Sequence, residues 1–528
     1  MIYYPKDWIN LQKKTTVLIV GSGPAGMSLA LKLEKLRIPS IIVEGGELNY
    51  TEESQEIYSG EVVSEHQLPH GLYGSRLRLL GGSGNCWAGM CGELDEEDFL
   101  SRDWIDKTGW PILKKDLNNY YDEAALFLNI DRRMIINPEE YAGVSPLVGF
   151  ESRSLKHTGN KSVLESFSYI EHLKKSNLIS VYLNANCTKI NTNSLNSTLI
   201  DSIEIRSYED HIKIINSQYV ILCCGGIENA RILLNSAESS KPTISNKYDL
   251  IGRYYSDHPV APCATVIGSE GKVSELSQFI NSSEQGTSPF YKIPFEIQKK
   301  LKISNSVAFF YKQEDELTEN DIAAFKLYKI LKGNKDFKLN RSDIIKISKN
   351  PYGIFKSYLQ RRKRRSGSVD SGRIAMRFQL EQTPNRESRV YLSDKLDKFG
   401  LKKVKLNWVF NKIERQTLNF LMAYTANALQ INKIGTLKMD EQLYNFNERL
   451  PLDLRGGQHH CGTTRMAINS KQGVVDKNLK VFGTKNLFIC GSSIFPTNSW
   501  VNPTFTIVAF SLRLADFIVK NQYSNNKI

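Results

Sequence analysis

The sequence lacks the features of a membrane-spanning, disulfide-stapled or metal-binding protein. No apolar run reaches the ~18 residues that a bilayer-spanning helix needs, and residues 1–7 carry neither a secretory hydrophobic region nor a twin-arginine signal. The eight cysteines are scattered without a CxxC pair, so we assign no metal and expect a reduced environment. These absences predict a cytoplasmic protein. At 528 residues, with a hydrophobic fraction of 41%, the chain is long enough for two substantial domains.

The formal net charge of +13 is concentrated in one segment. Residues 326–365 contain fourteen Lys or Arg and two Asp, a balance of +12, and end in five consecutive basic residues. The commoner interpretation of such a run is a solvated insertion. The alternative is a peripheral surface for an anionic membrane, an acidic substrate or an acidic partner. No nucleic-acid-binding module accompanies the charge, so we expect no nucleic-acid partner.

Residues 15–45 have the pattern of a dinucleotide-binding βαβ unit. An apolar, β-branched strand at 15–20 enters a glycine fingerprint, a helical pattern follows, and a second strand at 41–43 ends on an acid. Three glycines serve the tight turn, the approach to a pyrophosphate and the close packing of helix on strand, and the acid binds a ribose diol. The four residues, in that order, are Gly21, Gly23, Gly26 and Glu44. The acid disfavours a 2′-phosphorylated nucleotide.

The fingerprint alone fits either FAD or NAD, and two further features favour FAD. The motif lies near the beginning of the chain, and no second GxGxxG is present for a nicotinamide cofactor. A strand at 219–224 runs through Gly225 into a helical pattern, a second strand–Gly–helix unit that could return to the cofactor. A second Gly-rich loop at 81–89 could lay its backbone N–H groups against the cofactor. Its candidate binding residues are Gly81, Gly82, Ser83, Asn85, Cys86 and Trp87.

The remaining pattern predicts an α/β fold in which a Rossmann-type FAD-binding domain is assembled from discontinuous pieces. Strand-like runs at 373–378 and 389–392, with a long helix near 411–431, indicate an α+β substrate domain on an antiparallel sheet. The expected organisation is an FAD-binding domain from 1–125, 178–259 and 452–528, a connecting segment at 126–177, and a substrate-binding domain at 260–451 that holds the basic insertion.

Four blocks of the sequence resemble the GMC (glucose–methanol–choline) flavoprotein oxidoreductases, and in particular the pyranose and glycoside oxidases and dehydrogenases. The most specific block reads His-His-Cys-Gly-Thr-Thr-Arg-Met, then Gly-Val-Val-Asp, and finally Asn-Pro-Thr-Phe-Thr. The four blocks lie at 21–44, at 81–111, at 229–259 and at 459–506. The resemblance implies FAD, an alcohol or sugar hydroxyl as substrate, and a carbonyl product.

Carried over by motif, His459 and Asn502 match the catalytic pair of the family. The resemblance also implies cofactor contacts from Gly491, Ser492, Asn502, Pro503 and Thr504. Gly491 stands where many members have Asp. Cys86 stands where some members carry a histidine bonded to the flavin, so we expect the FAD to be non-covalent.

The chemistry of these two side chains supports the same interpretation. Neutral His459 can accept the hydroxyl proton while Asn502 holds the substrate oxygen, so that hydride leaves toward flavin N5. An alternative role for Asn502 is a helix N-cap, with Pro503 as the first helical residue. The spacing favours His459 over His460, and we expect His258 to be structural.

Two other functions remain open. Some relatives use this fold as non-redox hydroxynitrile lyases, and the basic segment could make the flavin fold an adaptor for a membrane or partner. The electron acceptor could be oxygen, a quinone or another carrier.

Overall fold

The computed structural model describes residues 1–66, 68, 70–158, 169–193, 198–237, 246–261, 264–268, 286–313, 347–348, 373–439 and 454–525. The basic segment 326–365 lies outside the described residues except for 347–348. In the part of the chain that is described, no helix combines the length and the apolar character needed to span a bilayer.

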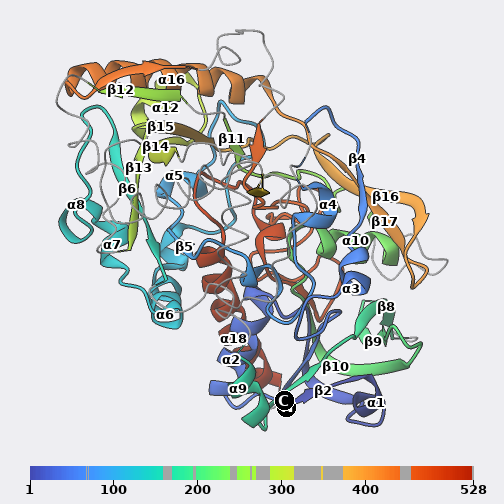
Figure 1. The fold of residues 1–528 in the computed structure, drawn as a ribbon. Helices are drawn as coiled ribbons and strands as arrows, with labels where there is room; N and C mark the ends of the chain where they lie inside the picture. The colour runs from blue at the N-terminus through green and yellow to red at the C-terminus, as the bar shows by residue number, and fades with distance from the viewer. Residues whose placement is uncertain are drawn as a thin grey trace.

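A largely parallel sheet forms the first layer of the fold (Figure 1). Its central strands are apolar and buried on both faces, which is why they read as continuous hydrophobic runs. The parallel strands, in spatial order, are β1 (Ile2–Tyr3), β7 (Ile179–Tyr182), β3 (Ser40–Val43), β2 (Lys14–Val20), β10 (Ile212–Leu222) and β20 (Leu487–Ile489). An antiparallel extension on β10 consists of β9 (Ile200–Arg206) and β8 (Asn186–Thr192).

Two helices directly follow strands of this sheet in the chain, and the last helix of the chain packs beside one of them. Helix α2 (Pro24–Lys35) follows β2, and α10 (Gly225–Ala237) follows β10. The last helix, α18 (Thr504–Asn525), packs against α2 and against α6 (Asn118–Leu128), and Figure 1 shows α2 and α18 side by side. The sheet therefore joins segments from both ends of the sequence, and the predicted discontinuous Rossmann-type α/β unit is confirmed.

An antiparallel sheet forms the second layer, as predicted. Helix α16 (Lys412–Ile431) lies across it (Figure 1). Along the strand of this sheet at Arg373–Leu380, alternate side chains such as Met376 and Phe378 enter a separate core beneath α16. Burying each such side chain contributes about 1.5–3 kcal/mol. The strands of the main path, in spatial order, are β18 (Gly435–Lys438), β12 (Ala264–Gly268), β15 (Arg373–Leu380), β14 (Ser306–Gln313), β13 (Thr287–Lys292), β6 (Glu151–His157) and β5 (Met90–Cys91). The short strands β11 (Pro259–Val260) and β19 (Arg455–Gly456) pair at its side.

A third, three-stranded sheet connects the two ends of the sequence in a way that the sequence pattern does not indicate. Strands β16 (Arg389–Leu396) and β17 (Lys402–Asn407) form a hairpin, and β17 pairs in parallel with β4 (Gly60–Val62). β16 also packs on α10. This part of the expected substrate-binding segment 260–451 therefore lies against the helix that follows β10 rather than in the antiparallel sheet.

Short helices complete the described chain. They are α1 (Pro5–Trp8), α3 (Glu52–Glu56), α4 (Gly71–Gly74), α5 (Glu96–Phe99), α7 (Arg133–Ile136), α8 (Pro138–Tyr141), α9 (Ile170–Lys175) and α12 (Phe295–Leu301), with 3-10 turns η1 (Gly82–Asn85), η2 (Lys114–Asp116) and η5 (Ser492–Ile494).

Candidate active site

A cavity of about 540 Å³ opens where β2, β3 and β10 end. This is the carboxyl edge of the parallel strands, where ligands of such sheets bind, and the volume is typical of a ligand pocket. Most of the predicted site residues line it. They are Gly21, Gly23, Glu44, Gly82, Ser83, Cys86, Trp87, Gly225, His459, Gly491, Ser492, Asn502, Pro503 and Thr504. Gly26, Gly81 and Asn85 do not line the cavity.

The fingerprint glycines differ in what surrounds them. A Cβ on Gly26 would stand 2.0 Å from the carbonyl oxygen of Gly21, so Gly26 permits the close packing of α2 on β2. Gly21 has a φ of +98°, which only glycine adopts easily. A Cβ on Gly23 would meet no heavy atom within 4 Å, and this glycine faces the cavity. As the residue that caps α2, Gly23 leaves the free N–H groups of the first turn available to an anion.

Glu44 is held in the cavity wall by the turn that it faces. One carboxylate oxygen accepts hydrogen bonds from the Ser22 backbone N–H at 3.0 Å and the Ser22 hydroxyl at 2.6 Å, and the other accepts from the Gly46 N–H at 2.9 Å. The Ser22 hydroxyl oxygen in turn accepts from the Gly81 N–H at 3.0 Å. Glu44 therefore joins the two Gly-rich loops and keeps acceptor capacity on one oxygen.

The second Gly-rich loop owes its shape to Asn85. The side-chain amide of Asn85 donates to the carbonyl oxygens of Leu80 at 2.8 Å and Gly82 at 2.9 Å. Gly81, with a φ of +87°, provides the turn. Asn85 and Gly81 thus support the loop, while Gly82, Ser83, Cys86 and Trp87 of the same loop line the cavity.

A buried ion network, which the sequence pattern does not reveal, forms another wall of the cavity. Glu228 pairs with Arg76 at 3.0 Å and with Arg231 at 3.2 Å, and Arg231 also pairs with Asp397 at 2.6 Å. Burial alone would raise the pKa of Glu228, but the neighbouring guanidinium groups lower it. Arg76 and Asp397 come from segments far from α10 in the sequence, so no local motif could identify the network.

His459 lines the cavity and contacts a second histidine. Its Nδ1 lies 2.9 Å from Nδ1 of His258, and Nε2 of His258 lies 3.0 Å from the backbone oxygen of Asn498. The pKa of His459 is lowered well below its usual value, because burial disfavours the cation and His258 and His460 lie close by. Neutral imidazole is the form that can accept a proton.

His460 occupies a different environment. Its Nδ1 lies 2.7 Å from the Tyr255 hydroxyl, and its carbonyl oxygen accepts from the Ser492 hydroxyl at 2.6 Å. Burial and the cation of Arg76 lower the pKa of His460 to about 3. His460 also reaches the cavity wall, but this residue is buried whereas His459 as a whole is partly exposed.

Asn502 is partly exposed in the cavity. Within the described ranges, its side-chain amide has no hydrogen-bond partner. The alternative in which Asn502 caps the last helix with Pro503 as first helical residue is wrong. Helix α18 begins at Thr504, and the carbonyl of Pro503 accepts the first helical bond, from the Ile507 N–H at 2.9 Å. Pro503 is thus the capping residue, which leaves the Asn502 amide free for a ligand.

The antiparallel sheet closes the cavity with side chains that the sequence pattern does not identify. Phe290 on β13 and Phe309 on β14 pack with their ring centroids 4.7 Å apart, and Arg377 and Gln379 on β15 face the same way. The Gln379 amide donates to the Trp500 carbonyl at 2.6 Å, two residues before Asn502. The sheet thus packs one face on α16 and presents the other to the cavity.

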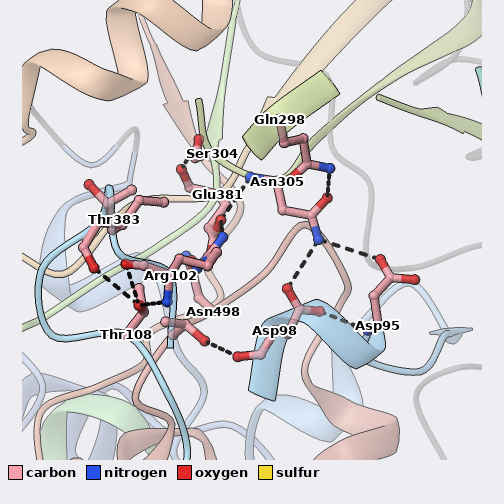
Figure 2. Close-up of polar contacts among 12 residues, drawn as sticks. Asp95, Asp98, Arg102, Thr108, Gln298, Ser304, Asn305, Glu381, Thr383 and Asn498 are labelled. Carbon is pink, nitrogen blue, oxygen red and sulfur yellow. Dashed lines mark hydrogen bonds and ion pairs between the residues drawn. The ribbon is translucent and has the colours of Figure 1, made fainter. Parts of the chain in front are cut away.

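Buried polar contacts fix the segment that leads to Asn502 (Figure 2). Asn305 donates to Asp98 at 3.0 Å, and the Trp500 indole N–H donates to Asp95 at 2.9 Å. Burial and the nearby charge of Asp95 raise the pKa of Asp98 to about 7. Burial alone would raise the pKa of Asp95, but the cations of Lys292 and Arg153 hold it below its usual value.

The motifs whose residues line this cavity agree with a comparison with known families. Residues 384–511 match the family model described as GMC oxidoreductase. Over this region the chain therefore resembles the GMC oxidoreductases. The resemblance noted from the sequence motifs is thereby confirmed.

Several known proteins are similar to this chain. It is 24% identical over 343 residues to the 2-methyl-1,2-propanediol dehydrogenase of Mycolicibacterium austroafricanum, a match that covers 63% of this chain but only 53% of the relative. The matched region thus spans about half of that relative's length. A shorter match, 37% identical over 62 residues, relates 12% of the chain to 11% of the pyranose 2-oxidase of Tricholoma matsutake.

Two solved structures share the fold over nearly their whole length. Pyridoxine 4-oxidase from Mesorbium loti has a TM-score of 0.58 at 13% identity and covers 95% of this chain and 99% of its own. Formate oxidase from Aspergillus oryzae has a TM-score of 0.58 at 17% identity, with 97% and 99% covered. At these identities the likeness shows the fold alone.

Proposed function

We propose that the protein binds FAD non-covalently in this cavity and oxidises a hydroxyl group of a sugar, glycoside or related polyol to a carbonyl. The matched relatives include a diol dehydrogenase and a pyranose oxidase, and the solved formate oxidase is an FAD protein. The observation that carries the proposal is the placement of His459 and Asn502 in one cavity with the fingerprint glycines Gly21 and Gly23.

The residues of the cavity fit FAD. Gly23 leaves open space next to the free N–H groups of α2, where a pyrophosphate would be bound. Glu44 retains an acceptor for a ribose hydroxyl. A cysteine rather than a histidine at position 86 excludes a histidyl bond to the flavin, which supports non-covalent binding.

The chemistry of the chain's own residues follows from their protonation. Bound FAD supplies the hydride acceptor. His459, neutral because its pKa is lowered, takes the proton of the substrate hydroxyl, which makes the carbinol C–H a better hydride donor. The Asn502 amide binds the substrate oxygen and orients that C–H bond. The positive end of α18, just beyond Pro503, favours negative charge in the cavity.

The wall that the antiparallel sheet contributes supports a hydroxylated ring as substrate. Phe290 and Phe309 offer an apolar surface, while Gln379 and Arg377 offer hydrogen-bonding groups beside it. Pockets that combine a mainly apolar lining with a few polar groups fix the orientation of small ligands.

The test is anaerobic mixing of the purified yellow holoenzyme with a panel of sugars, glycosides, polyols and simple alcohols. We expect at least one to bleach the visible flavin absorption. Admitting air afterwards separates an oxidase, whose colour returns at once, from a dehydrogenase that needs another acceptor. A colourless protein that cannot be reconstituted with FAD, or a holoenzyme that no hydroxyl compound bleaches, would contradict the proposal.

A further inference from the structure

We propose that His258 is a positioning residue that holds His459 in the tautomer whose Nε2 is free to accept a proton. This inference rests on the proposed function of His459 as base. It is carried by the His258–His459 contact, in which two ring nitrogens face each other at 2.9 Å.

The contact is built by a buried carboxylate that joins two loops distant in the sequence. The two oxygens of Asp257 accept the backbone N–H groups of His258 at 2.7 Å, His459 at 2.8 Å and Gln458 at 3.1 Å. The Asn498 side-chain amide donates to the Asp257 carbonyl at 2.9 Å. Asp257 therefore fixes the main chain of both loops that carry the histidine pair. The loops are ordered by Asp257, so the contact between the two rings does not have to order them.

Two glycines permit this close approach. A Cβ on Gly456 would stand 2.6 Å from a carboxylate oxygen of Asp257, and one on Gly457 would stand 3.0 Å from Nδ1 of His459. Any side chain at these two positions would push the loop that carries His459 and His460, here called the histidine loop, away from Asp257. The absence of side chains at 456 and 457 thus allows the contact between His459 and His258.

Hydrogen-bond chemistry then decides where each proton lies. Nε2 of His258 faces the backbone oxygen of Asn498, which can only accept, so this nitrogen carries the N–H. In a neutral imidazole the other nitrogen is then an acceptor, and Nδ1 of His258 must receive its hydrogen bond from Nδ1–H of His459. The proton of His459 is therefore on Nδ1, and the lone pair of its Nε2 remains for the substrate.

The surroundings keep both rings neutral. Burial lowers the pKa of His258 to about 4, although the bond to Asn498 and the charge of Glu381 act in the opposite direction. The charged and titratable groups that face the pair are Asp257, His460, Arg76 next to His460, and Glu381 next to His258. Among the described residues, Nε2 of His459 has no hydrogen-bond partner, and His459 lines the cavity.

The direct test is nitrogen-15 NMR of the holoenzyme labelled at histidine, at about pH 8. The His459 signals are assigned by their loss in His459→Gln. We expect the shifts of an Nδ1–H tautomer for His459 and of an Nε2–H tautomer for His258. An Nε2–H tautomer at His459 would overturn the inference, whatever the enzyme's activity.

Two variants of His258 separate positioning from packing, because each preserves one of its two hydrogen bonds. Asn places its amide oxygen where Nδ1 of His258 lies and can still accept from His459. Gln places its amide where Nε2 lies and can still donate to Asn498, but it no longer reaches His459. We expect His258→Asn to retain the Nδ1–H tautomer of His459 and most of the rate of flavin reduction. His258→Gln should lose the tautomer and slow reduction by roughly 10²-fold, the lower end of what a general base contributes.

The controls keep this inference distinct from the proposed function. FAD content and the thermal midpoint report whether a variant is folded. If His258→Gln reduces flavin like the wild type while His258→Asn does not, His258 acts by packing and the inference is wrong. If no alcohol reduces the wild type, the proposed function fails, and the NMR shifts still decide the tautomer.

Discussion

Gly226 lies against the main chain of His460 so closely that a Cβ on Gly226 would stand 2.0 Å from the His460 carbonyl oxygen. Helix α10 and the histidine loop are thus in backbone contact, and the position of His459 depends on a residue in the nucleotide-binding layer. No local pattern around Gly226 indicates this role, because its partner is more than 200 residues away.

We expect Gly226→Ala to displace the histidine loop. The substitution should lower stability by about 1–3 kcal/mol, as overpacking does, and should also slow flavin reduction because His459 moves with the loop. Thermal unfolding and anaerobic stopped-flow absorbance measure the two effects.

Gly483→Ala is the matched control for that variant. Gly483 has a φ of +82° and no heavy atom near a Cβ position, and it does not line the cavity. Alanine there should cost roughly 1–2 kcal/mol of backbone strain and leave flavin reduction unchanged. Equal rates in both variants would show that the Gly226 contact does not position the base.

The fingerprint glycines should separate folding from cofactor binding. Gly26→Ala places a Cβ 2.0 Å from the Gly21 carbonyl oxygen and should destabilise the apoprotein. Gly23→Ala meets nothing in the protein, so the apoprotein should lose less than about 1 kcal/mol, while FAD affinity falls because the methyl group occupies the phosphate space. Unfolding of the apoprotein and fluorescence titration with FAD give the two values. A Gly23→Ala protein with wild-type FAD affinity would place the pyrophosphate elsewhere.

These glycines also show how much of the site the sequence predicts. The strand–glycine–helix order is local, so the fingerprint, its acid and the cavity-lining loop at 81–89 could be identified from neighbouring residues. The histidine loop and Asn502 were recognisable because their motif is compact. The exact start of α18 was not, since Asn is a favoured cap and Pro a favoured first helical residue, yet the helix begins one residue later, at Thr504.

The rest of the site depends on strand pairing between remote segments. Phe290, Phe309 and Gln379 meet in the cavity only because β13, β14 and β15 are neighbours in the sheet. The pairing of β17 with β4 likewise joins segments more than 300 residues apart. Alternation along one strand shows which side chains share a face, but it does not show which strand lies beside it.

Breaking the buried ion pair between Arg102 and Glu381 should strongly destabilise the fold. The two terminal nitrogens of Arg102 donate hydrogen bonds to the two carboxylate oxygens of Glu381, at 2.7 and 2.6 Å (Figure 2). Both side chains are almost fully buried. Glu381→Gln leaves the guanidinium without a counter-charge, so we expect a loss of about 3–5 kcal/mol. Glu53→Gln, which removes the partner of exposed Lys398, should cost less than about 1 kcal/mol. Denaturant unfolding measures both, and similar losses would contradict this account.

The raised pKa of Asp98 predicts a pH-dependent stability. Its pKa of about 7 in the folded protein lies above the unfolded value, so the folded state binds more protons in this range and stability falls as the pH rises through 7. Asp98→Asn cannot titrate. We therefore expect the wild type to gain about 1 kcal/mol relative to the variant between pH 8 and pH 6. A difference between the two proteins that does not change with pH would mean that Asp98 stays ionised.

The most direct test of the account is the rate of flavin bleaching in His459→Ala, measured under anaerobic conditions with an alcohol that bleaches the wild type. We predict a yellow, folded protein whose flavin is reduced 10²- to 10⁴-fold more slowly, which is roughly the range that a general base contributes. A His459→Ala protein that bleaches at the wild-type rate would contradict it.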